Sequence, residues 1–227
     1  MTRHRALVAI RSTEHEGVFT DGAWLYTRNL VPGRAVYGES LRRDGAVEYR
    51  GWDANRSKLA AYLKKGGRHR AFRPASSVLY LGAASGTTAS HVSDLCPRGT
   101  VVAVEVSPRA FRDLVVLAES RGNLIPVLGD ASRPDTYRNR AAMTDVLYQD
   151  VAQRDQVDIF LRNADLLRPG GTGYLMLKAR SADVTADPAE VYRAATRSLS
   201  SAGLRVVDVR TLDPLAKAHA TIVVVRS

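Results

Sequence analysis

Four ionisable side chains stand at positions from which they could act together. Glu105, Asp130, Asp150 and Lys178 each come at or just after the end of an apolar run of the kind that forms a buried strand. Another such run ends in the glycine-containing stretch "GAASGTT", residues 82–88. In open α/β sheets, ligands bind beyond the carboxyl ends of the strands. If these runs form one parallel sheet, its edge offers three carboxylates, an amine and a set of backbone amides.

The glycine stretch predicts a nucleoside-like ligand. Glu105 follows Gly82 by 23 residues, a spacing at which an acidic side chain commonly accepts hydrogen bonds from a ribose. A fingerprint for pyrophosphate would need a glycine where Ala84 stands, whereas here the next glycine is Gly86. The G-x-x-x-G pattern is typical of S-adenosylmethionine sites, in which a carboxylate such as Asp130 helps to position adenine. The pattern favours S-adenosylmethionine, with NAD as the alternative.

The charge balance predicts a polyanionic partner such as nucleic acid. The 227 residues include 33 Lys and Arg against 23 Asp and Glu, which gives a net charge of +10. Arginine cannot lose its proton at neutral pH, whereas a partly buried lysine can become a base. The lysines are therefore of individual interest, and there are only five of them: Lys58, Lys64, Lys65, Lys178 and Lys217.

The cysteine and histidine content argues against a metal site. A single cysteine, Cys96, excludes an internal disulfide and a cysteine-rich zinc site. The five histidines are scattered without metal-ligand spacing. No metal is predicted. No run approaches the roughly 18 apolar residues of a membrane span, and the amino-terminal apolar segment is too short for a signal peptide, so a cytoplasmic protein is expected.

Two kinds of pattern divide the chain, and we predict a small β-rich module over 1–54 and a main domain over 55–227. The first part consists of short β-like runs broken by Asp-Gly and Pro-Gly, which is typical of hairpins. From Asn55, "NRSKLAAYLKKG" predicts a helix with an asparagine cap and a stop at Gly66. The connector "KKGGRHRAFRP" is predicted to be a solvated loop, with phosphate contact as the alternative.

Beyond residue 77 the pattern predicts an α/β fold, a doubly wound and mostly parallel sheet of seven strands. Seven continuous apolar runs alternate with helical patterns such as "SPRAFRDLVVLAESRG", as expected of strands buried on both faces. The connection between the last two runs is too short for a crossover helix, so these two strands should be antiparallel. Their runs are "LRVVDVRTL" and "ATIVVVR".

The chain resembles the fibrillarin family in its archaeal form, the RNA 2′-O-methyltransferases of box C/D guide ribonucleoproteins, whose Rossmann-like methyltransferase domain has this sheet. The most specific similarity is "VLYLGAASGTTASHVSD", residues 78–94, and the others extend almost from end to end. They are "HEGVF", "LVPGRAVYGE", "RSKLAA", "GDAS", "DVLYQDVAQ", "LRPGGTGYLMLKARS" and "HATIVVV". The resemblance implies methylation of ribosomal RNA, with transfer RNA as a further substrate.

The resemblance also implies the site residues. The catalytic group is Lys58, Asp150, Lys178 and His219, and the S-adenosylmethionine site comprises Gly82, Ala84, Ser85, Gly86, Thr87, Thr88, Glu105, Val106, Asp130, Ala131, Asp150 and Gln153. Removing the proton of a ribose 2′-hydroxyl makes it a better nucleophile for a sulfonium methyl. We expect Lys178 to accept this proton, Lys58 to orient the hydroxyl, and Asp150 to hold the two amines.

The residues around His219 allow two interpretations of its role. If the last strand is antiparallel, its first residue lies at the edge where the parallel strands end, which would bring His219 to the site. Relatives usually have an acidic residue just before this histidine, whereas here it is Ala218, so the imidazole could lack an orienting group. A histidine at the edge of a strand, without a catalytic role, is the alternative.

The expected partners follow from the resemblance: a Nop-family scaffold protein, a kink-turn-binding ribosomal-protein-like subunit, the box C/D guide RNA and the target RNA, and no membrane. Trp24, Tyr26 and Tyr37 are candidates for a docking face, with an ordinary module core as the alternative. A non-catalytic particle subunit that keeps the methyltransferase fold is the competing function.

Overall fold

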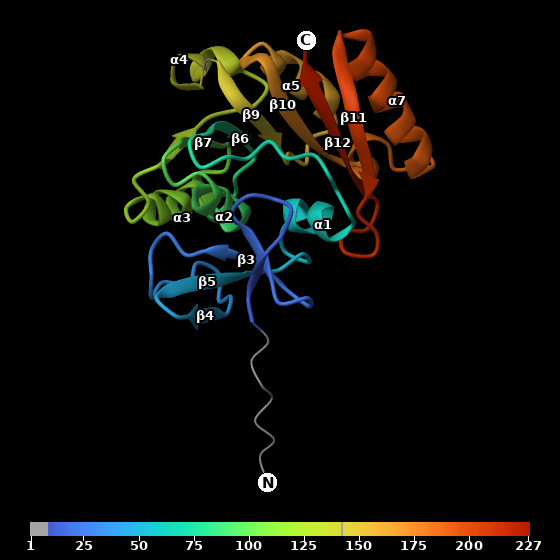
Figure 1. Cartoon of the computed structure of the whole chain (residues 1–227). Helices are drawn as coiled ribbons and strands as arrows, with labels where there is room; N and C mark the ends of the chain where they lie inside the picture. Colours follow the sequence, from blue (N-terminus) through green and yellow to red (C-terminus); the bar gives the residue numbers. More distant parts are fainter. Residues whose placement is uncertain (1–8, 142) are drawn as a thin grey trace.

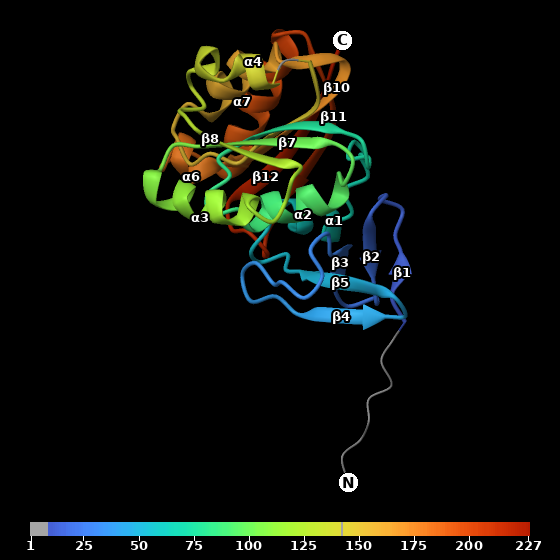
Figure 2. The same cartoon turned by 90° about the vertical axis from the view of Figure 1, so that its left-hand side faces the viewer.

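The protein is described by a computed structural model over residues 9–141 and 143–227. Its strands form two separate sheets, a small one near the amino terminus and a large one that carries most of the chain (Figures 1 and 2). His4 and the first part of the amino-terminal apolar segment lie outside the described residues. Within the described part of the chain, no helix has the length and apolar composition to cross a membrane.

The small sheet is antiparallel and confirms the predicted hairpins. Its strands lie in the order β1-β2-β3-β5-β4. Gly22 and Gly45, with φ of 95° and 59°, stand in the turns before β3 and β5, where a left-handed backbone favours glycine. The division of the chain at residue 54 stays a prediction. The strands are β1 Arg11–Ser12, β2 Val18–Thr20, β3 Leu25–Arg28, β4 Leu41–Asp44 and β5 Val47–Trp52.

The large sheet confirms the predicted doubly wound fold. Its seven strands lie in the order β11-β12-β10-β9-β6-β7-β8. The neighbours from β10 to β8 are parallel, and β12 is antiparallel to both β10 and β11, as the short last connection predicts. The strands are β6 Ser77–Leu81, β7 Thr100–Glu105, β8 Leu124–Leu128, β9 Thr144–Gln149, β10 Leu167–Lys178, β11 Leu204–Thr211 and β12 His219–Arg226.

Helices cover both faces of the large sheet. Helices α1, α2 and α3 lie on the face toward the small sheet, and α4, α5 and α7 lie on the other (Figure 1). A short η1 helix, Pro134–Thr136, precedes α4, and α6 directly follows β10. The bounds are α1 Lys58–Lys64, α2 Thr87–Leu95, α3 Pro108–Ala118, α4 Arg138–Ala141, α5 Gln156–Ala164, α6 Ala179–Ala182 and α7 Pro188–Ser201.

The predicted asparagine cap of the first helix is wrong. Helix α1 begins at Lys58, and its cap is Ser57, whose Oγ accepts a hydrogen bond of 3.3 Å from Ala60 N. Asn55 lies in a preceding turn, in which Asp53 Oδ1 accepts from the backbone and side-chain nitrogens of Asn55. Asp53 and Asn55 thus satisfy each other, and the cap moves two residues along the chain.

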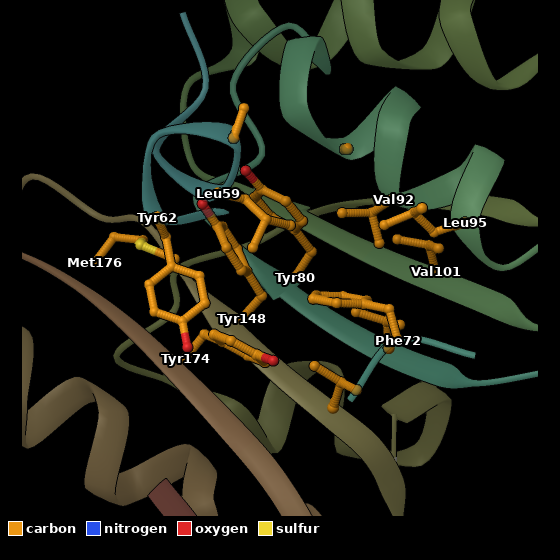
Figure 3. Packing of buried hydrophobic residues seen from close by; sticks show 14 of the residues in the cluster. Leu59, Tyr62, Phe72, Tyr80, Val92, Leu95, Val101, Tyr148, Tyr174 and Met176 are labelled. Atoms are coloured by element: carbon orange, nitrogen blue, oxygen red, sulfur yellow. The ribbon is translucent and has the colours of Figure 1, made fainter. Parts of the chain in front are cut away.

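Alternation along each strand explains the continuous apolar runs. Tyr80, Tyr148 and Tyr174 stand on neighbouring strands and point toward α1 and α2, where they pack with Leu59, Tyr62 and Phe72 (Figure 3). The ring centroids of Tyr80 and Tyr148 are 4.5 Å apart. The residues that alternate with these tyrosines along the strands, among them Leu79, Leu147 and Leu175, point to the other face of the sheet. Both faces are therefore buried, as strands in the middle of a doubly wound sheet require.

A buried ionic cluster joins the small sheet to α2. The Arg50 side chain is fully buried, and it lies 2.8 Å from Asp94 and 2.7 Å from Glu39. Arg121, next to α3, lies 2.7 Å from the other oxygen of Asp94. Removing one member of a buried ion pair typically costs about 3–5 kcal/mol because its partner stays buried and unpaired. The cluster therefore fixes the small sheet beside the helix that follows the glycine stretch.

Candidate functional site

The glycine stretch forms the turn between β6 and α2. Gly82 has φ of 78°, and a Cβ built on it would lie 2.4 Å from the backbone oxygen of Asp150. Asp150 N donates to Leu81 O at 2.9 Å, so the end of β9 lies against this turn. Gly86, with φ of 94°, is the N-cap of α2. Only glycine at position 82 permits this close approach.

Glu105 at the end of β7 holds the turn from the other side. Its Oε2 accepts a hydrogen bond of 2.7 Å from Ala84 N, and its Oε1 accepts one of 2.7 Å from Ser107 N. Each carboxylate oxygen keeps a second lone pair, so Glu105 can still accept hydrogen bonds from a ligand. Ala84 and Ser85 are exposed beside it, and Val106 is 59% exposed. A short apolar surface thus accompanies the carboxylate.

Asp130 follows β8 and stays ionised at neutral pH. Ser132 N donates to Asp130 Oδ1 at 2.8 Å, and this hydrogen bond is the largest cause of the lowered pKa of Asp130. Hydrogen bonds from the side chains of Ser132 and Gln153 lower this pKa further. Gln153 follows β9, so this contact brings two loops of the predicted cofactor site together. Ala131 is buried, and its carbonyl accepts from Asn163 Nδ2 at 2.9 Å.

Lys58 and Asp150 form an ion pair between α1 and the end of β9. Lys58 Nζ lies 2.8 Å from Oδ1 and 2.9 Å from Oδ2 of Asp150. Both side chains are partly exposed, at 27% and 20%. Thr88 Oγ1, at the start of α2, donates to Ser57 Oγ at 3.0 Å. The cap of α1 is therefore tied to the glycine stretch, and this contact fixes the position from which Lys58 reaches Asp150.

Gln156 fixes the backbone of Lys178. No feature of the sequence pattern indicates this role of Gln156. Gln156 is buried at the start of α5, and its Oε1 accepts from Lys178 N at 2.9 Å while its Nε2 donates to Lys178 O at 3.1 Å. Its own backbone oxygen accepts from Gln149 Nε2 at 2.7 Å. A chain of two buried amides thus connects the end of β9 with the end of β10. Gln156 could have been found only from the contacts of α5 with β10.

His219 lies beside Lys178, because these two residues pair in the register of β10 and β12. Its Nδ1 is 2.7 Å from Lys217 O. A carbonyl only accepts, so Nδ1 carries the proton and Nε2 is the acceptor of the neutral ring. Burial is the largest cause of the lowered pKa of His219, and the charges of Lys58 and Lys178 lower this pKa further, whereas the Lys217 hydrogen bond and the charge of Asp150 raise it. The imidazole is neutral at pH 7, and the Lys217 carbonyl orients it.

The structure thus brings the four predicted catalytic side chains to one edge of the large sheet, beside the glycine stretch and the two carboxylates at the ends of β7 and β8. Thr87 is half-buried and Thr88 is buried at the start of α2. Among the described residues, no group of three or more His, Cys, Asp or Glu side chains could hold a metal ion. Binding and catalytic roles for the individual residues remain predictions.

The basic connector at 64–74 lies away from this edge. His69 Nε2 is 3.0 Å from Thr172 Oγ1, in the first half of β10, and Arg70 pairs with Glu14 at 2.7 Å. Of the three aromatic residues proposed for docking, Tyr26 is buried and Tyr37 is half-buried, whereas Trp24 is 51% exposed. Tyr26 is therefore part of the core of the small sheet, and of the three residues only Trp24 is exposed.

Comparison with known proteins places the chain in a family. A family model described as fibrillarin matches residues 10–227. The fibrillarin-like rRNA/tRNA 2′-O-methyltransferase of Aeropyrum pernix is 49% identical over 198 residues, which is 86% of this chain and 85% of that protein.

Two solved structures share the whole architecture. Aeropyrum pernix fibrillarin with natively bound S-adenosyl-L-methionine has a TM-score of 0.87 and 45% identity, and the match covers 96% of this chain and 98% of that one. The fibrillarin of a fibrillarin/Nop5p complex has a TM-score of 0.86 and 38% identity, with 94% and 99% covered. The chain belongs to the fibrillarin family.

Proposed function

We propose that the chain is an S-adenosylmethionine-dependent RNA 2′-O-methyltransferase that modifies ribosomal RNA, with transfer RNA as a second substrate, within a cytoplasmic box C/D guide ribonucleoprotein. The observation that carries the proposal is the Lys58–Asp150 ion pair beside the glycine turn, with Lys178 and His219 at the same edge of the sheet. A relative named rRNA/tRNA 2′-O-methyltransferase, 49% identical to this chain, supports the acceptor.

The donor set of the site fits S-adenosylmethionine. Glu105 and Asp130 offer carboxylate oxygens to hydroxyl and amino groups of a nucleoside, and the exposed Val106 offers an apolar contact to a base. Gly82 lets the end of β9 lie against the glycine turn, because a Cβ there would meet Asp150 O at 2.4 Å, and this close approach brings Asp150 beside the turn. We assign the nucleoside part to these residues and to Ala84, Thr87, Thr88 and Ala131, and the methionine part to Asp150 and Gln153. When bound, the cofactor supplies a methyl group activated by its positive sulfur.

The acceptor hydroxyl needs a group that removes or shares its proton. We assign this role to Lys178, whose backbone Gln156 fixes on both sides. Neutral His219 presents Nε2 as an acceptor, which would take a hydrogen bond from the Lys178 amine and hold that amine beside the hydroxyl, whose oxygen Lys58 would orient. Lys58 is held by Asp150 and supplies a fixed positive charge near the reacting oxygen. Positioning of the hydroxyl for in-line attack would supply much of the rate.

The same proposal includes the partners. A Nop-family scaffold is supported by the fibrillarin/Nop5p complex, whose fibrillarin this chain resembles at 38% identity. A kink-turn-binding subunit and the box C/D guide RNA complete the proposed particle. Base pairing with the guide would select the target, so the protein needs phosphate contacts more than base contacts, which its net charge of +10 suits.

Methylation of a guide-paired RNA by the reconstituted particle tests the function. Lys178→Ala and Lys178→Arg are compared with the wild type at saturating cofactor, because arginine keeps the charge but cannot accept a proton. We expect both variants to lose roughly 100-fold or more in rate. Full activity of Lys178→Arg would assign Lys178 an electrostatic role instead.

Calorimetry separates the competing functions. A non-catalytic particle subunit predicts no binding of S-adenosylmethionine to the wild type, and an oxidoreductase predicts tighter binding of NAD. We expect binding of S-adenosylmethionine and none of NAD at the same concentration, because Ala84 stands where a pyrophosphate site has glycine.

A further inference from the structure

A hollow beside the glycine stretch is lined by three arginines. It has a volume of about 490 Å³ and lies where the loop between β3 and β4 meets α2 and α3 (Figure 2). Arg34, Arg56 and Arg121 line it, together with Ser85 and Thr87 of the glycine stretch. We call it the Arg56 hollow.

The charge of the Arg56 hollow is positive and only partly compensated. Arg121 pairs with Asp94 at 2.7 Å, so its charge is balanced inside the molecule. Arg34 and Arg56 are exposed, and neither forms an ion pair with a carboxylate in the described part of the chain. Of the described residues that line the hollow, Asp113 alone is acidic. Two free guanidinium groups against one carboxylate suit an anionic ligand.

The Arg56 side chain is held in place by Tyr37. Its guanidinium lies 4.8 Å from the centre of the Tyr37 ring, and its Nη1 donates to Tyr37 O at 3.0 Å. Glu39 fixes Tyr37 in turn, because its carboxylate accepts hydrogen bonds from Tyr37 N at 2.8 Å and from Val36 N at 2.9 Å. A guanidinium held in this way loses little freedom on binding, and its remaining N–H donors stay available for an anion.

Arg56 lies close to the proposed site of methyl transfer, because it precedes Lys58 by two residues in the chain. Ser57, between them, caps α1 and accepts a hydrogen bond of 3.0 Å from Thr88 Oγ1. This contact ties the start of α1 to the start of α2, where Thr87 also lines the Arg56 hollow. An anion in the hollow therefore lies beside the position of the acceptor hydroxyl.

We propose that the Arg56 hollow binds one of the two backbone phosphates that flank the modified nucleotide of the paired target RNA, with Arg34 and Arg56 as donors. This phosphate site rests on the proposed function, because it takes a guide-paired RNA as the acceptor. Pairing engages the bases of the target but leaves its 2′-hydroxyls and phosphates accessible along the minor groove. A protein that reaches a 2′-hydroxyl from this side meets the neighbouring phosphates, which guanidinium groups fit well.

The salt dependence of methylation tests the charge of Arg56. The reconstituted particle methylates a guide-paired RNA in a single turnover, at saturating cofactor and target and at several salt concentrations. We expect Arg56→Gln to lower the rate about tenfold at low salt, the size of one charge-assisted contact. The slope of log rate against log salt should become shallower by about one, because one phosphate contact is lost. Arg56→Lys keeps the charge and should keep the slope of the wild type.

Shortened targets locate the phosphate. One target begins at the modified nucleotide with a free 5′-hydroxyl, and the other ends there with a free 3′-hydroxyl, so each lacks one flanking phosphate. With one of the two, the rates of the wild type and of Arg56→Gln should agree within about twofold, because the contact is already absent. With the other, the tenfold difference should remain.

Arg34→Gln and Arg193→Gln complete the set of variants. Arg34→Gln should lower the rate severalfold and make the salt slope shallower, as Arg56→Gln does. Arg193 lies on α7, on the other face of the large sheet, where its exposed side chain lies 3.7 Å from Glu190. Arg193→Gln removes the same charge at a distant place and should keep both the rate and the slope of the wild type.

Several results would overturn the phosphate site. Arg56→Gln could methylate at the wild-type rate, or it could lose the same factor at every salt concentration, which would indicate a structural role. A tenfold difference that persists with both shortened targets would place the contact elsewhere. Weaker binding of Arg56→Gln to a purified Nop-family scaffold, with an unchanged salt slope, would make the hollow a protein interface.

The wild type keeps the failure of this site apart from the failure of the proposed function. If the wild-type particle does not methylate the intact target, the proposed function is contradicted. If it does, and no change at Arg56 alters the rate, only the phosphate site is contradicted. Binding of S-adenosylmethionine to Arg56→Gln, measured by calorimetry, should stay within about twofold of the wild type, because the contact is made to RNA.

Discussion

Lys58 Nζ lies 2.8 and 2.9 Å from the two carboxylate oxygens of Asp150, although 92 residues separate them in the sequence. We expect Asp150→Asn to lower the rate of methyl transfer roughly 100-fold or more, because the amide keeps the shape but no longer holds the Lys58 charge. Cofactor affinity should fall about tenfold, the size of one lost charge-assisted contact. Single-turnover rates at saturating cofactor measure the first effect and calorimetry measures the second.

Asp145 offers a matched control on the same strand. It stands near the opposite end of β9, where it pairs with the exposed Arg168 at 2.8 Å and accepts a hydrogen bond from Ser77 N. Asp145→Asn should keep the rate within about twofold, since exposed ion pairs contribute little. An equal loss of rate in both variants would show that Asp150 acts only through the stability of β9.

Gly82 is predicted to tolerate no side chain. Gly82→Ala would combine a left-handed backbone with a Cβ 2.4 Å from Asp150 O, whereas Gly170→Ala, with φ of 75°, meets nothing within 4 Å. We expect Gly170→Ala to lower the free energy of unfolding by about 1–2 kcal/mol, the cost of the left-handed backbone alone. Gly82→Ala should cost more and should also weaken cofactor binding. Equal losses of unfolding free energy for Gly82→Ala and Gly170→Ala, measured by urea denaturation, would contradict the close approach of the two loops.

Gln156 is predicted to be a positioning residue for Lys178. Gln156→Ala removes both side-chain hydrogen bonds to the Lys178 backbone and should lower kcat at least tenfold while the KM for cofactor stays within about twofold. Asn123→Ala serves as the control, because the Asn123 amide likewise makes two hydrogen bonds to the backbone, to Ser93 O and Cys96 O, and one with Ser93 Oγ, but lies away from this edge. Both variants should lose about 1–3 kcal/mol of stability. If Gln156 had only a structural role, the kcat of Gln156→Ala would equal that of Asn123→Ala.

The buried His91 predicts a loss of stability in mild acid. Burial is the largest cause of its pKa lying well below 6.5, and the charges of Arg50 and Arg121 lower the pKa further. Below about pH 6.5 the unfolded chain binds a proton that the folded chain does not, so the stability present above that pH is lost as pH falls. The free energy of unfolding, measured with denaturant, should be lower at about pH 5 than at about pH 7.5, and His91 should account for roughly 1–2 kcal/mol of the difference.

His91→Gln provides the check, since an amide can keep a hydrogen bond to Thr27 or Tyr37 but does not titrate in this range. Its stability should depend less on pH than that of the wild type. The pKa values of His15, His69 and His219 are also lowered, chiefly by burial, so part of the dependence should remain. If the stability of His91→Gln depended on pH as steeply as that of the wild type, His91 would not be the cause of the loss in mild acid.

The sequence pattern predicts the large sheet well because its strands are buried on both faces. The residues of "VLYL" in β6 and of "VLY" in β9 are all buried and are all apolar or aromatic, and such runs are visible without a structure. The antiparallel last strand followed from the shortness of one connection, and its register brought His219 beside Lys178. The edge of the sheet and its charged ends could therefore be predicted.

The positioning contacts could not be predicted, because they depend on which helices meet. Ser57 rather than Asn55 caps α1, since Asp53 already engages Asn55 in a turn. Gln156 contacts Lys178 only through the packing of α5 on β10, and an isolated glutamine carries no such signal. The Lys217 carbonyl likewise reaches His219 Nδ1 across Ala218, whose φ is 54°, and a contact from a backbone carbonyl does not depend on a residue type that the sequence would show.

A guide-paired target RNA with a single 2′-deoxy nucleotide at the modified position tests the central claim most directly. The reconstituted particle is supplied with S-adenosylmethionine carrying a labelled methyl group, and label in the RNA is measured for this target and for the matched all-ribose target. We predict one methyl group per all-ribose target and none above background for the deoxy target, because the 2′-oxygen is the nucleophile. Equal labelling of the two targets would contradict the account.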